Sequence, residues 1–364
     1  MSGTSVDAID AALLQCGDKG HALLSTHQHP IPSTLRKRII SISHTGPEEI
    51  ERMGELDRDL GLLFADATNV LLENSGTSAQ AVLAIGSHGQ TIRHRPPSAP
   101  GNNGQSFTLQ IGDPSTIAER TGITTVADFR RRDIAAGGEG APLAPSFHAA
   151  AFAKANVNRA IVNIGGIANI SLLLGESLSE GFDTGPGNTL LDAWISRHTG
   201  DLFDRGGQWA ASGKVDSDLL QQLLHHPYFK KSGPRSTGKE AFNLNWLDEQ
   251  LSNHGEADAV DIQATLTELT VASISQPILE CAEDVAEIYL CGGGAHNLHL
   301  VSRLSQQLAP RTISSTALIG MDPDWVEAAT FAWLAKQTLE GLSGNSEVVT
   351  GASGPRVLGG IYQA

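Results

Sequence analysis

Apolar residues recur along this chain at two spacings, one typical of helices and one typical of strands. Residues 47–75 predict a long helix, because apolar side chains return there every three or four positions. These side chains are Ile50, Met53, Leu56, Leu60, Leu63, Phe64 and Ala67. The same reasoning predicts helices at 263–286, 298–309 and 324–341.

Short apolar runs between the helices predict strands. They cover residues 6–16, 21–32, 81–90, 107–112, 123–129, 159–164, 167–174 and 287–291. A further helix is predicted after Asp113, a favoured cap, with Pro114 at its first position. Residues 93–105 are rich in Pro, Gly and Asn and predict an exposed hairpin. Because strands alternate with helices, the predicted class is α/β.

Length and charge narrow the choice of function. A chain of 364 residues predicts two domains of ordinary size. A formal charge of −15 argues against a nucleic-acid partner, although a few local donors can still bind a small anion. The three cysteines form no CxxC pair and fit a reducing cytoplasm. The sequence shows no signal peptide and no apolar run long enough to predict a membrane span.

The stretch GPRSTGKE, residues 233–240, is close to a phosphate-binding P-loop. A P-loop follows a buried strand, and its last position is a Ser or Thr that binds magnesium. Here HHPYFKKS precedes the stretch, and Glu240 stands at the magnesium position. Two other readings are a solvated surface loop and a helix cap by Ser236 or Thr237.

Glycine-rich turns offer better phosphate sites. In MSGTSVDAID, Gly3, Thr4 and Ser5 predict a tight turn with amide and hydroxyl donors. Asp7 and Asp10 follow, and either carboxylate could hold a hydrated magnesium ion. A simple capped turn explains this spacing equally well.

Two later stretches repeat the pattern. In NIGGIANI, Gly165 and Gly166 permit close backbone approach and Asn169 adds a donor. The third stretch is LCGGGAHN, in which Gly292, Gly293 and Gly294 end a strand and open a helix, leaving a floor for a purine and amides near a phosphate. The glycine hairpins at the N-terminus and at 160–175 predict two similar α/β halves that face one cleft.

Asp183 is the candidate chemical residue. It opens the stretch DTGPGN, directly before the apolar helix start TLLDAWI. A carboxylate at a rigid bend near a helix N-terminus stays ionised and can take a proton from water or a sugar hydroxyl. The alternative is a plain helix cap, which Asp also favours.

Taken together, these stretches resemble the anhydro-N-acetylmuramic acid kinases of the actin-like, sugar kinase and Hsp70 ATPase superfamily. The matching motifs span essentially the whole chain: MSGTSVDAID, IGSHGQTIRH, QIGDPSTIAERTGITTVADFRRRDIAAGGEGAPLAP, NIGGIANIS, GFDTGPGN, STGKEAFN, LCGGGAHN and EAATFAWLA. The resemblance implies two ribonuclease-H-like α/β domains around a central cleft. We expect domain I to comprise 1–126 with 350–364, and domain II to comprise 127–349.

The resemblance also implies a reaction. Members of this family use ATP, Mg²⁺ and water to convert 1,6-anhydro-N-acetylmuramic acid to N-acetylmuramic acid 6-phosphate and ADP, which recycles cell-wall sugar. The implied partners are ATP and a sugar, with no nucleic acid or membrane, and the superfamily resemblance suggests a homodimer. The rival readings are a simple sugar kinase of the same fold and an ATP-dependent binding module without enzymatic activity.

The resemblance assigns roles residue by residue. Asp183 is the base, and the three glycine-rich stretches bind the nucleotide, with Asp7 or Asp10 on the metal. The sugar-facing residues are His88, Gln90, Arg131, Asp133 and Glu327. Without the resemblance, Arg130 to Arg132 would be interpreted as a solvent-exposed basic run. His88 would be interpreted as a histidine in a loop, hydrogen-bonded to backbone.

The chain departs from the family pattern at two places. It starts at the first glycine turn, where the family has an apolar strand beforehand, and neighbours of a missing strand would be unpaired. We therefore expect weaker folding or activity if the protein lacks that strand. Ala8 stands where the family usually has Gly, which matters only if the position needs a positive φ or close phosphate approach.

Overall fold

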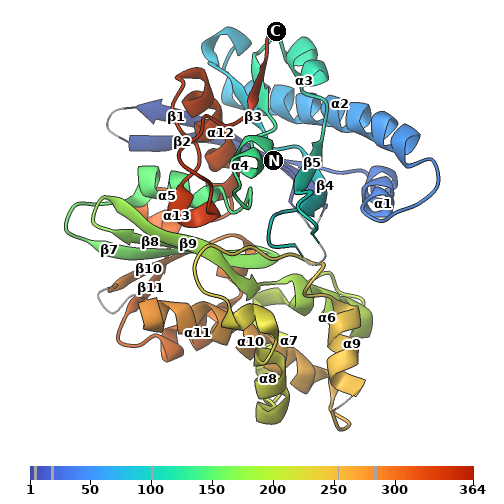
Figure 1. Cartoon of the computed structure of the whole chain (residues 1–364), viewed down its shortest axis with the longest axis vertical. Helices are drawn as coiled ribbons and strands as arrows, with labels where there is room; N and C mark the ends of the chain where they lie inside the picture. The colour runs from blue at the N-terminus through green and yellow to red at the C-terminus, as the bar shows by residue number, and fades with distance from the viewer. Residues whose placement is uncertain (4–5, 18–19, 100–101, 253, 282–284) are drawn as a thin grey trace. The chain divides into compact units, whose positions relative to one another are not determined.

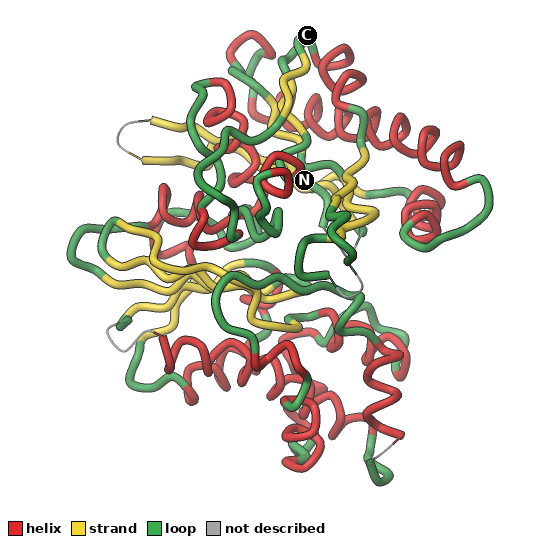
Figure 2. The backbone as a smooth tube through the Cα atoms, viewed as in Figure 1, coloured by secondary structure: helices red, strands yellow, loops and turns green. Residues whose placement is uncertain are grey.

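The chain forms two compact units, each of which mixes strands and helices (Figures 1 and 2). The computed structural model describes residues 1–364 except 4–5, 18–19, 100–101, 253 and 282–284. Unit 1 comprises Met1–Ala151 and Trp325–Ala364, and unit 2 comprises Phe152–Asp324. The predicted α/β class is confirmed. None of the helices in the described part of the chain has the length and apolar character needed to cross a bilayer.

The boundaries of these units differ from the predicted domains. Residues 127–151 and 325–349 were assigned to the second domain, but both belong to unit 1. They are tied to the rest of that unit and to each other: the Asn345 side chain donates to Asp133. The physical reason is that segments far apart in sequence hydrogen-bond in space, which the spacing of apolar residues does not show.

Unit 2 is built on one sheet whose strand order is β11-β10-β7-β8-β9. The strands are β7 (Asn158–Ile164), β8 (Ile167–Leu174), β9 (Ser177–Pro186), β10 (Glu287–Cys291) and β11 (Thr312–Ser315). β8 pairs antiparallel with β7 and β9, whereas β10 runs parallel to β7 and β11. Three antiparallel strands followed by two parallel ones form the ribonuclease-H-like arrangement that the resemblance implied.

The helices of unit 2 cover this sheet and extend beyond it. They are α6 (Thr189–His198), α7 (Gln208–Ser212), α8 (Ser217–Leu224), α9 (Leu244–Ser252), α10 (Ala259–Cys281) and α11 (Leu298–Gln307). α10 packs against β8 and β9, and α11 packs against β11. The core beneath them buries Ile164, Ile170, Ile274 and Leu300, each fully. Burial of β7 and β8 explains why they read as continuous apolar runs rather than alternating ones.

Unit 1 contains several small sheets. Its strands are β1 (Ala8–Gly17), β2 (Gly20–Pro30), β3 (Ile85–Ser87), β4 (Gln90–Arg95), β5 (Phe107–Ile111), β6 (Thr125–Ala127) and β12 (Gly360–Tyr362). β1 pairs with β2, β4 pairs with β5, and β6 lies between β3 and β12. Ser2 bridges to Ile9, so the first residues lie beside β1.

Unit 1 also contains helices, some of which pack against these strands. They are α1 (Ser33–Ile42), α2 (Glu49–Ser75), α3 (Pro114–Thr121), α4 (Arg131–Ala135), α5 (Ala144–Phe152), α12 (Val326–Leu339) and α13 (Glu347–Thr350). α12 packs against β1, β3 and β6. The approach to β3 is so close that a Cβ at Gly86 would lie 1.9 Å from the Phe331 carbonyl oxygen. Glycine is therefore required at this position.

Most of the locally encoded elements are confirmed. The helix predicted at 47–75 is α2, and the Asp113 side chain accepts from the Ser115 and Thr116 amides to cap α3. Residues 93–99 and 102–105 lie in β4 and in the connection between antiparallel β4 and β5. Ala8 is a strand residue without a positive φ, so its methyl group strains nothing there.

Candidate active site

The second glycine turn joins β7 to β8 and is held by hydrogen bonds from the segment before α6. The Asn188 amide donates to the Gly165 carbonyl oxygen (2.8 Å), and the Gly187 amide donates to that of Gly166 (2.9 Å). A Cβ at Gly187 would lie 2.4 Å from the Gly165 oxygen. The backbone of the turn and that of the segment are therefore held in direct contact at Gly165, Gly166 and Gly187.

The third glycine stretch packs on the same turn. A Cβ at Gly294 would lie 2.3 Å from the Ile164 side chain, and one at Gly292 would lie 2.4 Å from Asn163 Oδ1. Gly292 also has a φ of +78°, a conformation that favours glycine. At Gly293 the nearest atom to a Cβ is Asn188 Nδ2 at 4.0 Å, so this residue borders open space. The structure thus brings two of the three predicted phosphate stretches together.

Asp183 lies in β9, opposite Asn169 of β8. The prediction of a bend before a helix is wrong, because β9 continues to Pro186 and the residue before α6 is Asn188. Asp183 is therefore no helix cap. The pairing register shifts between Ala168 and Asn169. This β-bulge is a common device for re-aiming a side chain next to a functional site.

The stretch GPRSTGKE, residues 233–240, does not have the structure of a P-loop. It is a loop between the short helix Pro227–Lys230 and α9, with no strand before it. The Thr237 amide donates to Asp183 Oδ2 (3.0 Å), and the Asp183 amide donates to the Arg235 carbonyl oxygen (3.2 Å). The stretch is not a P-loop. It holds the candidate base.

Tyr228 adds a third contact that sequence reasoning missed. Its hydroxyl group donates to the Asp183 carbonyl oxygen (2.6 Å). The Arg235 guanidinium group stacks on the Phe182 ring, 3.9 Å from its centroid. Asp183 is buried, with 6% of its surface exposed. The carboxylate is thus fixed by backbone and side-chain contacts from residues about fifty positions away.

Asn169 is buried beside Asp183, and its Oδ1 has no hydrogen-bond partner among the described residues. A buried polar atom without a partner costs free energy, and such atoms often mark a ligand site. Asn169 was predicted to contact the nucleotide. Its place between the glycine turn and Asp183 is compatible with that prediction.

In unit 1, His88 and Gln90 are both buried, and each side chain is held by hydrogen bonds. Ser2 donates to Gln90 Oε1 (2.7 Å). His88 Nδ1 donates to the Gly89 carbonyl oxygen (2.9 Å), so its Nε2 accepts from Arg130 Nε (3.0 Å). Burial, followed by the positive charge of Arg130, holds the pKa of His88 well below its usual value. The imidazole is therefore neutral and fixed in one tautomer.

Glu327, the first acidic residue of α12, belongs to the same neighbourhood. Solvent reaches its side chain, but the surrounding protein still raises the pKa of its carboxyl group through desolvation. Arg130 lowers that pKa and Asp10 raises it. Arg130, which was not assigned a role from the sequence, thus hydrogen-bonds His88 and acts on Glu327 through its charge.

The other two sugar-facing candidates lie differently. The Arg131 side chain is 57% exposed and pairs with Asp128 at 3.4 Å. Asp133 is fully buried and accepts from Asn345 Nδ2 (2.7 Å), the Thr350 hydroxyl (2.7 Å) and the Gly140 amide (2.8 Å). Through these contacts Asp133 connects α4 to the C-terminal segment, which gives the residue a structural role.

The first glycine stretch is described only in part, because Thr4 and Ser5 lie outside the described residues. Gly3 is half-buried. Asp7 is exposed in the bend before β1. Asp10 lies in β1, and its Oδ1 accepts from Gln28 Nε2 (3.2 Å). No group of three or more His, Cys, Asp or Glu residues in the described part is arranged to hold a metal ion.

The five-stranded sheet, two glycine-rich backbone stretches that pack together and the buried carboxylate of Asp183 define an α/β protein with a ribonuclease-H-like unit. Comparisons with known proteins specify the family. The anhydro-N-acetylmuramic acid kinase family model matches residues 1–364, and the chain belongs to this family.

Two named relatives are similar in sequence to this chain over its full length. The anhydro-N-acetylmuramic acid kinase of Shewanella woodyi is 50% identical over 365 residues, which cover 100% of this chain and 97% of that protein. The kinase of the same name from Coxiella burnetii (strain Dugway 5J108-111) is 52% identical, covering 100% and 96%.

Solved structures are more distant. Component A of the Acidaminococcus fermentans (R)-2-hydroxyglutaryl-CoA dehydratase is 13% identical with a TM-score of 0.43, covering 90% of this chain and 99% of that one. The ROK hexokinase of Thermus thermophilus is 14% identical with a TM-score of 0.34, at the same coverage.

Proposed function

We propose that this protein is an ATP-dependent kinase that opens 1,6-anhydro-N-acetylmuramic acid with water and phosphorylates the freed O6. The products are N-acetylmuramic acid 6-phosphate and ADP. Membership of the family and the full-length identity to kinases of that name support this proposal. The structural observation that carries it is the carboxylate of Asp183, which accepts from the Thr237 amide and lies opposite Asn169 in the sheet of unit 2.

Asp183 is the general base of the proposed reaction. It takes a proton from water, whose oxygen bonds to the anomeric carbon while the bond from that carbon to O6 breaks. O6 then takes the γ-phosphoryl group of ATP, and ADP leaves. The Thr237 amide holds one carboxylate oxygen and stabilises its charge. The Tyr228 contact fixes the backbone behind it. A base fixed in this way loses little entropy in reaching the proton.

The nucleotide is assigned to the glycine surface of unit 2. Its phosphates would lie at the amides around Gly165 and Gly166, and its adenosine would lie at Gly293, which borders open space. Backbone donors that are already fixed stabilise the charge that develops during phosphoryl transfer without further reorganisation.

Unit 1 is assigned to the sugar. Both ring nitrogens of His88 and both ends of the Gln90 amide are engaged by protein groups, so these two residues position their neighbours. Glu327 is exposed to solvent, and the positive charge of Arg130 lowers the pKa of its carboxyl group. Glu327 and Arg130 are therefore the residues proposed to contact sugar oxygens. Arg131 is proposed only as a peripheral contact.

Magnesium is expected to accompany ATP. This ion takes one or two carboxylates and otherwise water and phosphate oxygens. Asp7 and Asp10 meet this requirement, and the lack of a larger acidic group among the described residues is compatible with it. When bound, the ion would neutralise phosphate charge.

Oxygen-18 water tests the proposal. In the proposed reaction the label enters at C1 of the product, whereas a simple sugar kinase introduces none. Asp183→Asn should abolish turnover and leave ATP binding within about twofold, as fluorescent nucleotide titration would measure. Unlabelled product from the wild-type enzyme, or full activity of the variant, would refute the proposed mechanism.

A further inference from the structure

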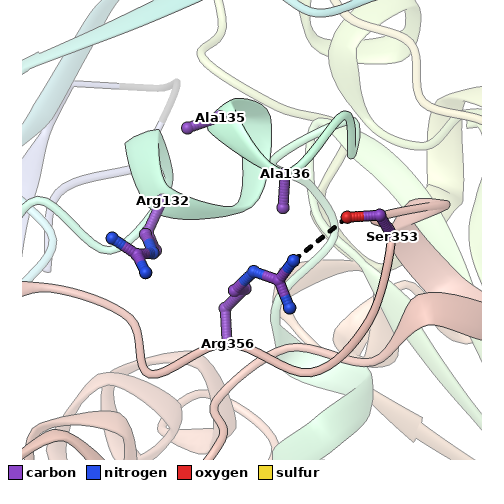
Figure 3. Close-up of a pocket in the computed structure, with 5 residues that line it drawn as sticks. All are labelled: Arg132, Ala135, Ala136, Ser353 and Arg356. Carbon is purple, nitrogen blue, oxygen red and sulfur yellow. Dashed lines mark hydrogen bonds between the residues drawn. The ribbon is translucent and has the colours of Figure 1, made fainter.

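A cavity of about 360 Å³ opens in unit 1 between α4 and the C-terminal loop. Its lining consists of Arg132, Ala135 and Ala136 from one segment and Ser353 and Arg356 from the other (Figure 3). This volume is at the low end of the range of small-molecule sites. None of these residues has a part in the proposed reaction.

The frame of the cavity is fixed. The Ser353 amide donates to the Ala136 carbonyl oxygen (2.8 Å), which joins the two segments directly. The Arg356 amide donates to Asn345 Oδ1 (2.6 Å), and Asn345 in turn donates to the buried Asp133. Asp133 lies one residue after Arg132. Both arginine backbones are therefore anchored to one buried carboxylate.

The Arg356 guanidinium group is oriented by its own loop. It donates to the Ser353 hydroxyl (3.1 Å) and to the Pro355 carbonyl oxygen (2.8 Å). A guanidinium group has five N–H donors, and these two bonds leave three of them for another partner. The Ser353 hydroxyl accepts in this contact and keeps its own proton for donation.

Arg132 differs from its neighbours in the run of three. Arg130 bonds to His88 and to the Gly140 carbonyl oxygen, and Arg131 pairs with Asp128. The described residues provide neither a hydrogen bond nor an ion pair for the Arg132 side chain. They also provide no ion pair for Arg356. Two arginines thus line one cavity without an acidic lining residue, in a chain of net charge −15.

We propose that this cavity binds a phosphate group, carried by inorganic phosphate or by a small phosphate monoester. Two guanidinium groups match the geometry and charge of a phosphate dianion, since each offers paired N–H donors. The Ala136 carbonyl oxygen, at the end of α4, already accepts a hydrogen bond from the Ser353 amide.

Calorimetric titration of the full chain with inorganic phosphate tests this site, with ionic strength held constant by chloride. The variants are Arg132→Gln and Arg356→Gln. The matched control is Arg120→Gln, which removes the same charge from an exposed position of α3 in the same unit. Phosphate bound at the glycine turns of unit 2 is unaffected by all three substitutions. The measurement needs no turnover and is independent of the proposed reaction.

We expect Kd for one phosphate to rise at least tenfold in Arg132→Gln and in Arg356→Gln and to stay unchanged in Arg120→Gln. The described residues give the Arg132 side chain no hydrogen bond or ion pair, so its variant tests the site even if Arg356→Gln disturbs the loop. Two results would overturn the proposal. One is equal phosphate binding in all four proteins. The other is no binding to the wild type at about 20 mM phosphate, a concentration on the order of the dissociation constant of a weak anion site. A parallel titration with glucose 6-phosphate separates the sources: tighter binding than inorganic phosphate identifies a monoester, and weaker binding identifies the free anion.

Discussion

Asp133→Asn separates a structural role from a role in substrate binding. The asparagine oxygen can keep the bonds from Asn345 and Thr350, but its NH₂ group then faces the Gly140 amide. That buried donor loses its acceptor, at a cost of about 1–3 kcal/mol. The two remaining bonds lose their charge assistance, about 1 kcal/mol each. Relief of the buried charge offsets part of this sum, so we expect a loss of about 3 kcal/mol.

Urea denaturation measures this loss as a change in the free energy of unfolding, and hydrogen exchange of the Gly140 amide reports the local contact. Asp128→Asn is the matched control, because it makes the same chemical change in an ion pair that solvent reaches, where a change of about 0.5 kcal/mol or less is expected. If Asp133→Asn unfolds like the wild type while KM for the sugar rises, the structural assignment is refuted. Asp133 would then face substrate.

Four further predictions follow from the site and the core. Gly292→Ala should cost about 2 kcal/mol in the free energy of unfolding, because φ is +78° and its Cβ meets Asn163. Gly293→Ala should leave stability unchanged but raise KM for ATP about tenfold, since its methyl group enters open space at the proposed nucleotide floor. Tyr228→Phe should lower kcat about tenfold and cost about 1–2 kcal/mol in unfolding, because the Asp183 carbonyl loses its donor. Burial lowers the pKa of His148 to about 3, so His148→Gln should remove this histidine's contribution to the loss of stability between pH 6.5 and 3.

The sign of the pH effect follows from linkage. An imidazole whose folded pKa lies below its unfolded value stabilises the fold above pH 6.5, and this stability is lost as pH falls towards the folded pKa. The dependence of unfolding free energy on pH should therefore fall by about 1.4 kcal/mol per pH unit in the variant. His44→Gln, at an exposed histidine, is the control. An unchanged slope in His148→Gln would contradict the assignment.

Outcomes that contradict the other predictions are equally direct. If Gly293→Ala leaves KM for ATP unaltered, adenosine does not lie at that glycine. If Tyr228→Phe keeps full kcat despite lower stability, the backbone behind Asp183 does not need its support. Tyr289→Phe controls for loss of a hydroxyl group, since its partner Glu287 also binds Arg159 and remains paired.

Local features of this fold could be predicted from the sequence because they depend on residues within one element. The spacing of apolar residues in α2 and the Asp113 cap of α3 are of this kind. The environment of Asp183 could not be predicted, because its strand register depends on Asn169 and its contacts come from Tyr228 and Thr237. Long-range pairing also decides that Asp133 is buried while Arg132 lines a cavity.

The division of unit 1 into two stretches of chain has a consequence for synthesis on the ribosome. Unit 2 is continuous and emerges whole, whereas α12 and β12, on which β1, β3 and β6 pack, emerge last. Nascent domains generally fold as units once their residues are available. The middle of this polypeptide should therefore acquire its native packing while the earlier-translated N-terminal region still awaits its closing helix.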